Sequence, residues 1–104
     1  MHVISKKPFT DATIEYSNDA KAIQATYKKL KAGSFNTPDA LKAVFMTLDN
    51  FKYKDRWWVI DIGGNNLRLI AFIDFTDNRL FVKHITNHTE YDKLNKKYAK
   101  EAKQ

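Results

Sequence analysis

Three apolar segments, at residues 57–62, 67–75 and 80–86, are separated by two turns of four residues each. The turns, at residues 63–66 (GGNN) and 76–79 (TDNR), are rich in residues that favour tight reversals of the chain. Strands joined by such short turns pair in the antiparallel direction, because a parallel crossover needs a dozen or more residues. The sequence therefore predicts a three-stranded antiparallel sheet in the second half of the chain.

The first half of the chain is predicted to be mainly helical. Apolar side chains recur there every three to four residues, and Thr37-Pro38 has the cap-then-proline pattern of a helix start. The other expected elements are a strand at residues 2–5, helices at 8–16, 20–31 and 38–45, a turn at 49–50, a strand at 51–53 and a last helix beginning near residue 89.

Pairing the strands across the two turns assigns each side chain to a face of the sheet. The first hairpin places Asp61 opposite Arg68, and the second places Phe72 opposite Lys83. One face is expected to be apolar, to include His84 and to be covered by the N-terminal helices. The other face would mix aromatic rings with cations, as an RNA platform does, although an ordinary solvated face has the same pattern. Further pairs expected in the second hairpin are Ile70–Ile85 and Arg68–Asn87.

The expected fold class is α+β, with N-terminal helices packed on one face of a mainly antiparallel, twisted sheet and a helical segment at the C-terminus. A length of 104 residues fits one domain over 1–104. Residues 93–104 carry five lysines. The last part, about 94–104, is therefore expected to be a frayed basic tail.

Basic residues outnumber acidic residues by 18 to 12, which gives a net charge of +6 and favours an anionic partner: RNA, DNA, an acidic protein or a membrane surface. The chain has no cysteine, which excludes disulfides, thiol nucleophiles and cysteine zinc sites. No apolar run approaches the roughly 20 residues of a membrane span, and the first residues do not resemble a signal peptide. A cytoplasmic protein is expected.

Arg68, Lys83, His88 and Tyr91 are the candidate catalytic residues. Arg68 presents paired donors for a phosphate in a transition state, and an ion pair with Asp61 is compatible with that role. Lys83 is either a phosphate ligand or a solvated strand lysine. His88 carries an imidazole, the usual side chain for general acid–base catalysis, and lies one helical turn before Tyr91, so the pair suits proton transfer. The alternative is that both residues only cap the last helix.

Five other residues are candidates for RNA binding. Lys52, Lys54 and Arg56 form a basic run beside two tryptophans, which suits contact with a phosphate backbone, although a solvated loop explains the run equally well. Asn65 in the first turn and Asn87 at the end of the last strand are further candidates. No residues have a convincing metal-ligand spacing, so neither a metal nor another cofactor is expected.

Several segments, in this order, resemble the HigB-type toxins of the RelE-like superfamily, which belong to type II toxin–antitoxin systems. The resemblance covers residues 1 to about 93, and the joint match is more specific than any single segment. The matching segments are residues 1–5 (MHVIS), 41–45 (LKAVF), 63–65 (GGN), 68–71 (RLIA) and 88–93 (HTEYDK).

The resemblance implies a metal-independent endoribonuclease that cleaves messenger RNA on the ribosome and inhibits translation. It also implies neutralisation by a HigA-type antitoxin with a helix-turn-helix domain, in a complex expected to be a heterotetramer. In RelE-like toxins, basic strand residues and a C-terminal tyrosine or histidine line the RNA site, and Arg68, Lys83, His88 and Tyr91 occupy the matching places. Lys83 stands where arginine is common, so it supplies charge without the bidentate fork.

A noncatalytic basic domain that binds RNA or an acidic protein is the alternative function. It explains the net charge and the aromatic residues equally well. Growth arrest on expression of the chain alone, relieved by a neighbouring antitoxin gene, would favour the toxin over the binding domain.

Overall fold

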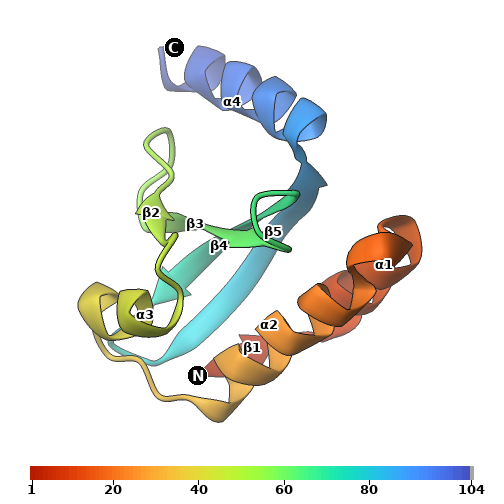
Figure 1. The fold of residues 1–104 in the computed structure, drawn as a ribbon. Coiled ribbons are helices and arrows are strands. Elements are labelled where there is room, and N and C mark those ends of the chain that lie inside the picture. Colours follow the sequence, from red (N-terminus) through yellow and green to blue (C-terminus); the bar gives the residue numbers. More distant parts are fainter. Residues whose placement is uncertain (104) are drawn as a thin grey trace.

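The computed structural model describes residues 1–103 and contains a five-stranded sheet in the order β1-β5-β4-β3-β2, with helices on both faces (Figure 1). Strand β1 runs parallel to β5, and the other neighbours are antiparallel. This arrangement confirms the predicted α+β class. The elements are β1 (His2–Ile4), α1 (Lys7–Glu15), the 3-10 helix η1 (Ser17–Asp19), α2 (Ala20–Ala32), α3 (Pro38–Val44), β2 (Asp49–Asn50), β3 (Trp57–Ile62), β4 (Leu67–Asp74), β5 (Arg79–Asn87) and α4 (His88–Ala102).

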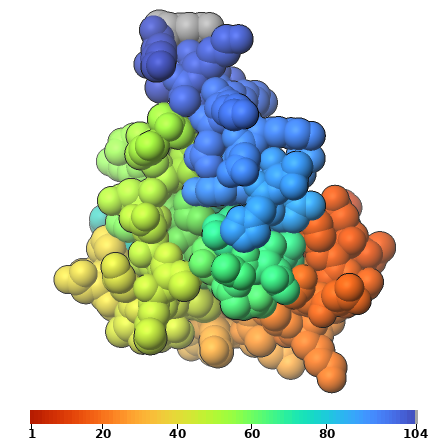
Figure 2. Space-filling view, turned by 45° about the horizontal axis from the view of Figure 1, so that its top comes forward, coloured from red at the N-terminus to blue at the C-terminus, as the bar shows by residue number. Residues whose placement is uncertain are grey.

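Helix α4 covers the face of the sheet opposite to α1 and α2 (Figures 1 and 2). Its apolar side chains Tyr91, Leu94 and Tyr98 follow the i, i+3, i+7 spacing of one helix face and pack against the buried Val59 and Ile70. The expectation of a frayed tail from about residue 94 differs from this structure, because α4 continues to Ala102. Gln104, the last residue of the expected tail, lies outside the described residues.

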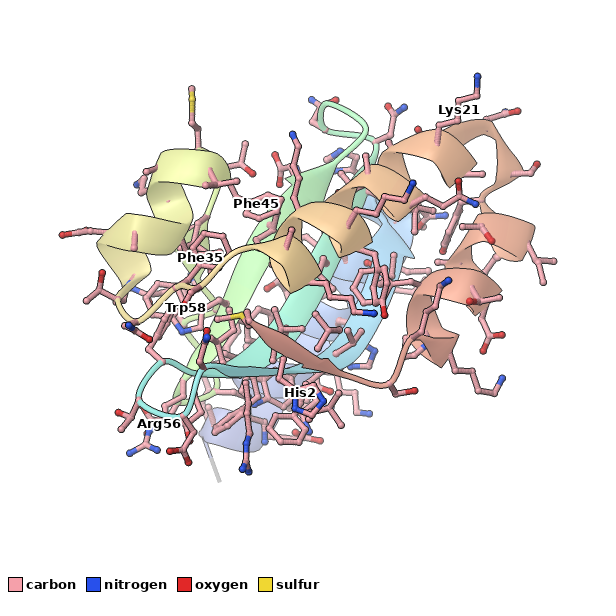
Figure 3. The ribbon with its side chains drawn as sticks, turned by 90° about the horizontal axis from the view of Figure 1, so that it is seen from below. His2, Lys21, Phe35, Phe45, Arg56 and Trp58 are labelled. Atoms are coloured by element: carbon pink, nitrogen blue, oxygen red, sulfur yellow. The ribbon has the colours of Figure 1, made fainter. Side chains whose placement is uncertain are left out.

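The N-terminal helices bury the other face of the sheet, as predicted. Phe9 of α1 and Ile23 and Leu30 of α2 join a cluster with Ile60 and Leu69 of the sheet, and all five are at most 2% exposed. Figure 3 looks onto this side, where α2 crosses in front of the strands. Each such side chain contributes about 1.5–3 kcal/mol by burial, so this cluster is the main core of the fold.

The loop before β3 differs from the prediction. Asp49 and Asn50, expected as a turn, form the short strand β2, whereas residues 51–56, expected to begin with a strand, form tight turns. The Phe51 N–H donates to the Trp57 carbonyl oxygen at 2.9 Å, and Arg56 has the left-handed φ of 62° that such a reversal requires.

The first hairpin has the predicted register, with Asp61 opposite Arg68. The predicted register of the second hairpin is wrong, because that hairpin closes between Asp74 and Arg79, one residue earlier on each strand. The Asp74 carboxylate accepts a hydrogen bond from the Asp77 N–H at 3.1 Å and thereby begins the turn.

A β-bulge at Lys83 shifts the register of β5 again, by one residue. The earlier closure of the hairpin pairs Phe72 with Phe81, two positions before Lys83. Beyond the bulge, His84 lies on the face under α4, not on the apolar face where it was expected. Ile85 and Asn87 correspondingly leave the mixed face to which they had been assigned. Beyond the bulge the pairs are Ile70–His84, Leu69–Ile85, Arg68–Thr86 and Leu67–Asn87.

His84 joins α4 to the sheet through a hydrogen bond of 2.8 Å between its Nε2 and the Tyr98 hydroxyl. Burial lowers the pKa of His84, and the positive charges of Lys97 and Lys83 lower it further. Burial raises the pKa of Tyr98, with a smaller contribution from Glu101. Both groups are therefore neutral near pH 7.

We expect Gly63→Ala to destabilise the fold more than Gly64→Ala. Both glycines have positive φ, 65° and 71°, so alanine costs about 1–2 kcal/mol of backbone strain at either position. A Cβ at Gly63 would also lie 2.6 Å from Asp19 Oδ1, so this carboxylate must move and lose its hydrogen bond from the Asn66 side chain, whereas a Cβ at Gly64 meets nothing within 4 Å. Urea unfolding of the two variants measures the difference, and equal losses of unfolding free energy would contradict the expected clash.

Lowering the pH from 7.5 to 5 should reduce the unfolding free energy of the native chain more than that of His84→Gln. The folded pKa of His84 lies below the unfolded value of about 6.5, so protons bind preferentially to the unfolded chain as the pH falls through this range. Urea midpoints at several pH values test this, with His2→Gln as the matched control for loss of a histidine. Parallel pH profiles for the native chain and His84→Gln would refute the coupling.

Candidate active site

Arg68 of β4 is held in one orientation by its neighbours. Its Nε lies 3.2 Å from Asp61 Oδ1, and its Nη1 donates to the backbone carbonyl oxygen of Asn65 at 3.0 Å. The Arg68 and Asp61 side chains are only 16% and 21% exposed, so the ion pair is little screened by water. The ion pair weighed as an alternative from the sequence is therefore present, and it orients the guanidinium.

One nitrogen of the Arg68 guanidinium, Nη2, is free. It donates no hydrogen bond within residues 1–103, and it is not among the buried side-chain atoms that lack a partner, so it faces solvent. A fixed guanidinium with free donors is suited to bind a phosphate oxygen.

His88 is brought to Arg68 by the start of α4. Asn87 caps this helix, its side-chain oxygen accepting from the Glu90 N–H at 2.9 Å. His88 Nε2 forms a hydrogen bond with the Asn65 carbonyl oxygen, which also accepts from Arg68. Because a carbonyl can only accept, Nε2 carries the hydrogen, and neutral His88 then has a bare Nδ1. This nitrogen is available as a base.

Tyr91 completes the cluster one helical turn after His88. The centre of its ring lies 5.7 Å from the Arg68 guanidinium carbon, within the range of a cation–π contact. The start of α4 lies against the β3–β4 hairpin that carries Asn65 (Figure 2). The structure thus brings three of the four candidate catalytic residues together, and the Asn65 backbone joins them.

Lys83, the fourth candidate, lies apart from this cluster. Its exposed Nζ is 5.6 Å from the ring centre of Trp57, which itself packs 5.3 Å from the ring of Tyr98. Tyr91 and Tyr98 are seven residues apart on α4, which corresponds to about 10 Å along the helix. Arg68 therefore contacts Tyr91 near the start of α4, whereas Lys83 contacts Trp57, which packs against Tyr98 further along the helix.

The basic residues in the loop before β3 border one cavity of about 390 Å³, but each has a different partner. Lys52 places its Nζ 5.1 Å from the ring centre of Tyr53 and stays exposed. Lys54 forms an ion pair with Glu101 of α4 at 3.5 Å and thus helps to hold that helix. The side chain of Arg56 is exposed and lies 3.9 Å from the neighbouring Asp55 carboxylate.

One feature of this cluster had no signal in the sequence, whereas the second, the helix cap at Asn87, had one, because a glutamate follows three residues later as is typical of a helix start. The Asn65 contribution comes from its backbone carbonyl, whereas its side chain was the expected contact. The Asn87 side-chain oxygen caps α4, which leaves only its amide nitrogen for RNA. The stripe of Tyr91, Leu94 and Tyr98 that carries α4 over the sheet is visible in the sequence at helical spacing.

Within residues 1–103, no group of three or more histidine, aspartate or glutamate side chains is placed to hold a metal ion. None of the helices in this part of the chain is both long and apolar enough to cross a membrane.

Comparison with known proteins gives consistent matches. Residues 19–94 match the family model HigB toxin, described as the RelE-like toxic component of a toxin–antitoxin system. An mRNA interferase HigB of Escherichia coli O6:H1 (strain CFT073) is 53% identical over 98 residues, which are 94% of this chain and 95% of the relative. The mRNA interferase toxin HigB of Escherichia coli K12 is 38% identical over 92 residues, 88% of each chain.

Proposed function

The chain belongs to the HigB family of RelE-like toxins, and from this premise we propose that it is an endoribonuclease that cleaves messenger RNA on the ribosome and so inhibits translation. The names of its relatives, mRNA interferases, support the activity. The observation that carries the proposal is the cluster of Arg68, His88 and Tyr91, in which a guanidinium with a free Nη2 lies beside a histidine with a bare nitrogen.

The proposed reaction uses the RNA's own ribose as the nucleophile. The 2′-oxygen attacks the adjacent phosphorus, the bond from phosphorus to the 5′-oxygen of the next nucleotide breaks, and the products are a 2′,3′-cyclic phosphate and a 5′-hydroxyl. A base must take the proton of the 2′-hydroxyl, and an acid must protonate the leaving 5′-oxygen. The transition state carries additional negative charge on the phosphate oxygens. The scheme requires no metal ion.

Each member of the cluster fits one of these tasks. The Nη2 of Arg68 stabilises charge on the phosphate oxygens, and Asp61 keeps the guanidinium in place. The bare Nδ1 of His88 accepts the proton of the 2′-hydroxyl. The Tyr91 hydroxyl is the candidate proton donor, while its ring supports Arg68 from one side.

Lys83 has a different task in this proposal. Because Lys83 contacts Trp57 and Arg68 contacts Tyr91, we assign Lys83 to a neighbouring phosphate and not to the one being cleaved. Exposed Lys52 similarly attracts the RNA backbone, and the Asn65 and Asn87 side-chain amides lie beside the cluster as further polar contacts.

We further propose that a HigA-type antitoxin with a helix-turn-helix domain neutralises the chain, in a heterotetrameric complex in the cytoplasm. The description of the family as one half of a toxin–antitoxin system supports the existence of such a partner.

The function is tested by expressing the chain alone and mapping transcript ends in translating and non-translating extracts. We expect growth arrest, new 5′-hydroxyl ends in messenger RNA, and cleavage in translating extracts only. Binding to RNA without new ends would establish the alternative, a noncatalytic basic domain. Equal cleavage in both extracts would refute ribosome dependence.

Arg68→Ala should slow cleavage about 10²-fold or more, equivalent to roughly 3 kcal/mol of transition-state stabilisation. Arg68→Lys, which keeps a charge beside Asp61 but loses the second donor, should also be strongly impaired. Single-turnover cleavage and circular dichroism separate lost activity from lost folding, and Arg79→Ala, at an exposed arginine outside the cluster, is the matched control. Native rates in a folded Arg68→Ala variant would refute the role.

His88→Gln should reduce cleavage by about 10²–10⁴-fold, the contribution of a general base. Glutamine can still donate a hydrogen bond to the Asn65 carbonyl oxygen, but it has no basic nitrogen to accept the proton. The pH–rate profile of the variant should lose the limb that depends on the histidine. A profile and rate equal to those of the native chain would assign the base to another residue.

A further inference from the structure

A cavity of about 430 Å³ lies beside the catalytic cluster, between α4 and the segment around β2. Its volume falls within the about 300–1,000 Å³ of small-molecule sites. Phe51, only 2% exposed, is among its lining residues. The other lining residues are Asp49, Asn50, Lys52, Tyr53, Tyr91 and Asn95.

Tyr91 joins this cavity to the catalytic cluster. Its ring borders the cavity and also lies 5.7 Å from the Arg68 guanidinium carbon. Tyr91 therefore borders both the cavity and the guanidinium that would bind the phosphate.

Aromatic rings line the cavity as stacking partners for a base. Tyr53 is held edge-on against Phe51, with ring centres 5.9 Å apart, and Lys52 lies 5.1 Å from the centre of the Tyr53 ring. Bases of single-stranded RNA are commonly recognised by stacking on tyrosine, at about 1–3 kcal/mol per base. Lys52 adds a positive charge for the attached phosphate.

The polar groups of the cavity are mostly free. The side-chain amides of Asn50 and Asn95 make no hydrogen bond within residues 1–103, and the Asp49 carboxylate accepts only from the Asn50 N–H, at 2.8 Å. A carboxylate accepts hydrogen bonds and cannot donate them. Asp49 therefore favours a base with an exocyclic amino group, which adenine, cytosine and guanine have and uracil lacks.

We propose that this cavity binds the base next to the cleaved phosphate, and that Asp49 makes it select adenine, cytosine or guanine over uracil. The selection rests on the proposed ribonuclease function, whose substrate it defines more closely. Tyr53 and Tyr91 stack on the base, Asn95 hydrogen-bonds to its edge, and Asp49 is the specificity-determining residue.

Binding of short RNA analogues tests the cavity without cleavage. The probes are 2′-O-methyl trinucleotides, which lack the attacking hydroxyl and differ only in the central base. The native chain should bind those with a central adenine, cytosine or guanine about tenfold more tightly than the uracil probe, the effect of one hydrogen bond to a charged group. Asp49→Asn, which can still accept from the Asn50 N–H, should reduce that ratio below about threefold, and Asn95→Ala should weaken the tight binders.

Asp55→Asn is the matched control, because its side chain is 98% exposed in the same loop and does not line the cavity. It should keep the native ratio. Equal binding of all four probes, no binding of any, or an unchanged ratio in folded Asp49→Asn would overturn the proposal.

Transcript mapping provides a second readout. Cleavage by Asp49→Asn should move toward sites with uracil at the selected position, and an unchanged distribution would count against the base site while leaving the ribonuclease intact. If the native chain cleaves no RNA, the ribonuclease proposal fails, and the trinucleotide ratios still decide whether the cavity discriminates between bases.

Discussion

The candidate active site depends on one piece of packing, the return of α4 across the sheet. Without it, His88 and Tyr91 would not meet Arg68, because they follow the last strand and Arg68 lies in the strand before. Tyr98 is 9% exposed and packs against Phe51 and Trp57, at ring-centre distances of 5.6 and 5.3 Å. These aromatic contacts anchor the far end of α4, and the Asn87 cap and the His88 hydrogen bond fix its start.

The Arg68–Asp61 pair adds orientation more than stability. A largely buried ion pair gains Coulomb energy but loses hydration, so its net contribution to folding is small or even unfavourable. Its value lies in holding the guanidinium with Nε on Asp61 and Nη1 on the Asn65 carbonyl oxygen, while Nη2 stays free. An exposed lysine at this position would lose side-chain conformational entropy when it binds phosphate. The arginine loses that entropy when the protein folds, because Asp61 and the Asn65 carbonyl already hold it in place.

Sequence reasoning predicted what local periodicity determines. Alternation along β3 and β4, with a four-residue loop, placed Asp61 opposite Arg68, and helical spacing identified Ile23 and Leu30 as core residues. Sequence reasoning was wrong where the structure is determined by contacts between distant residues or by main-chain groups. The bulge at Lys83 inserts one residue that no periodicity reveals, and it turned His84 toward α4. The lysines of residues 93–104 suggested fraying, although each can stay in water while Tyr98 is buried.

The distribution of positive charge explains why one cation is singled out for chemistry. Lys52, Lys54, Lys83 and Lys97 all lie near aromatic rings on the α4 side, so an RNA strand meets charge and stacking surface together. Such exposed charges raise the rate of encounter and are screened by salt, and they contribute little to a transition state. Among the cations on this face, Arg68 combines low exposure with a fixed partner and a free donor. The lysines can therefore attract the RNA. The chemistry is assigned to Arg68, because its positive charge is the least screened by water and its geometry is fixed before the substrate binds.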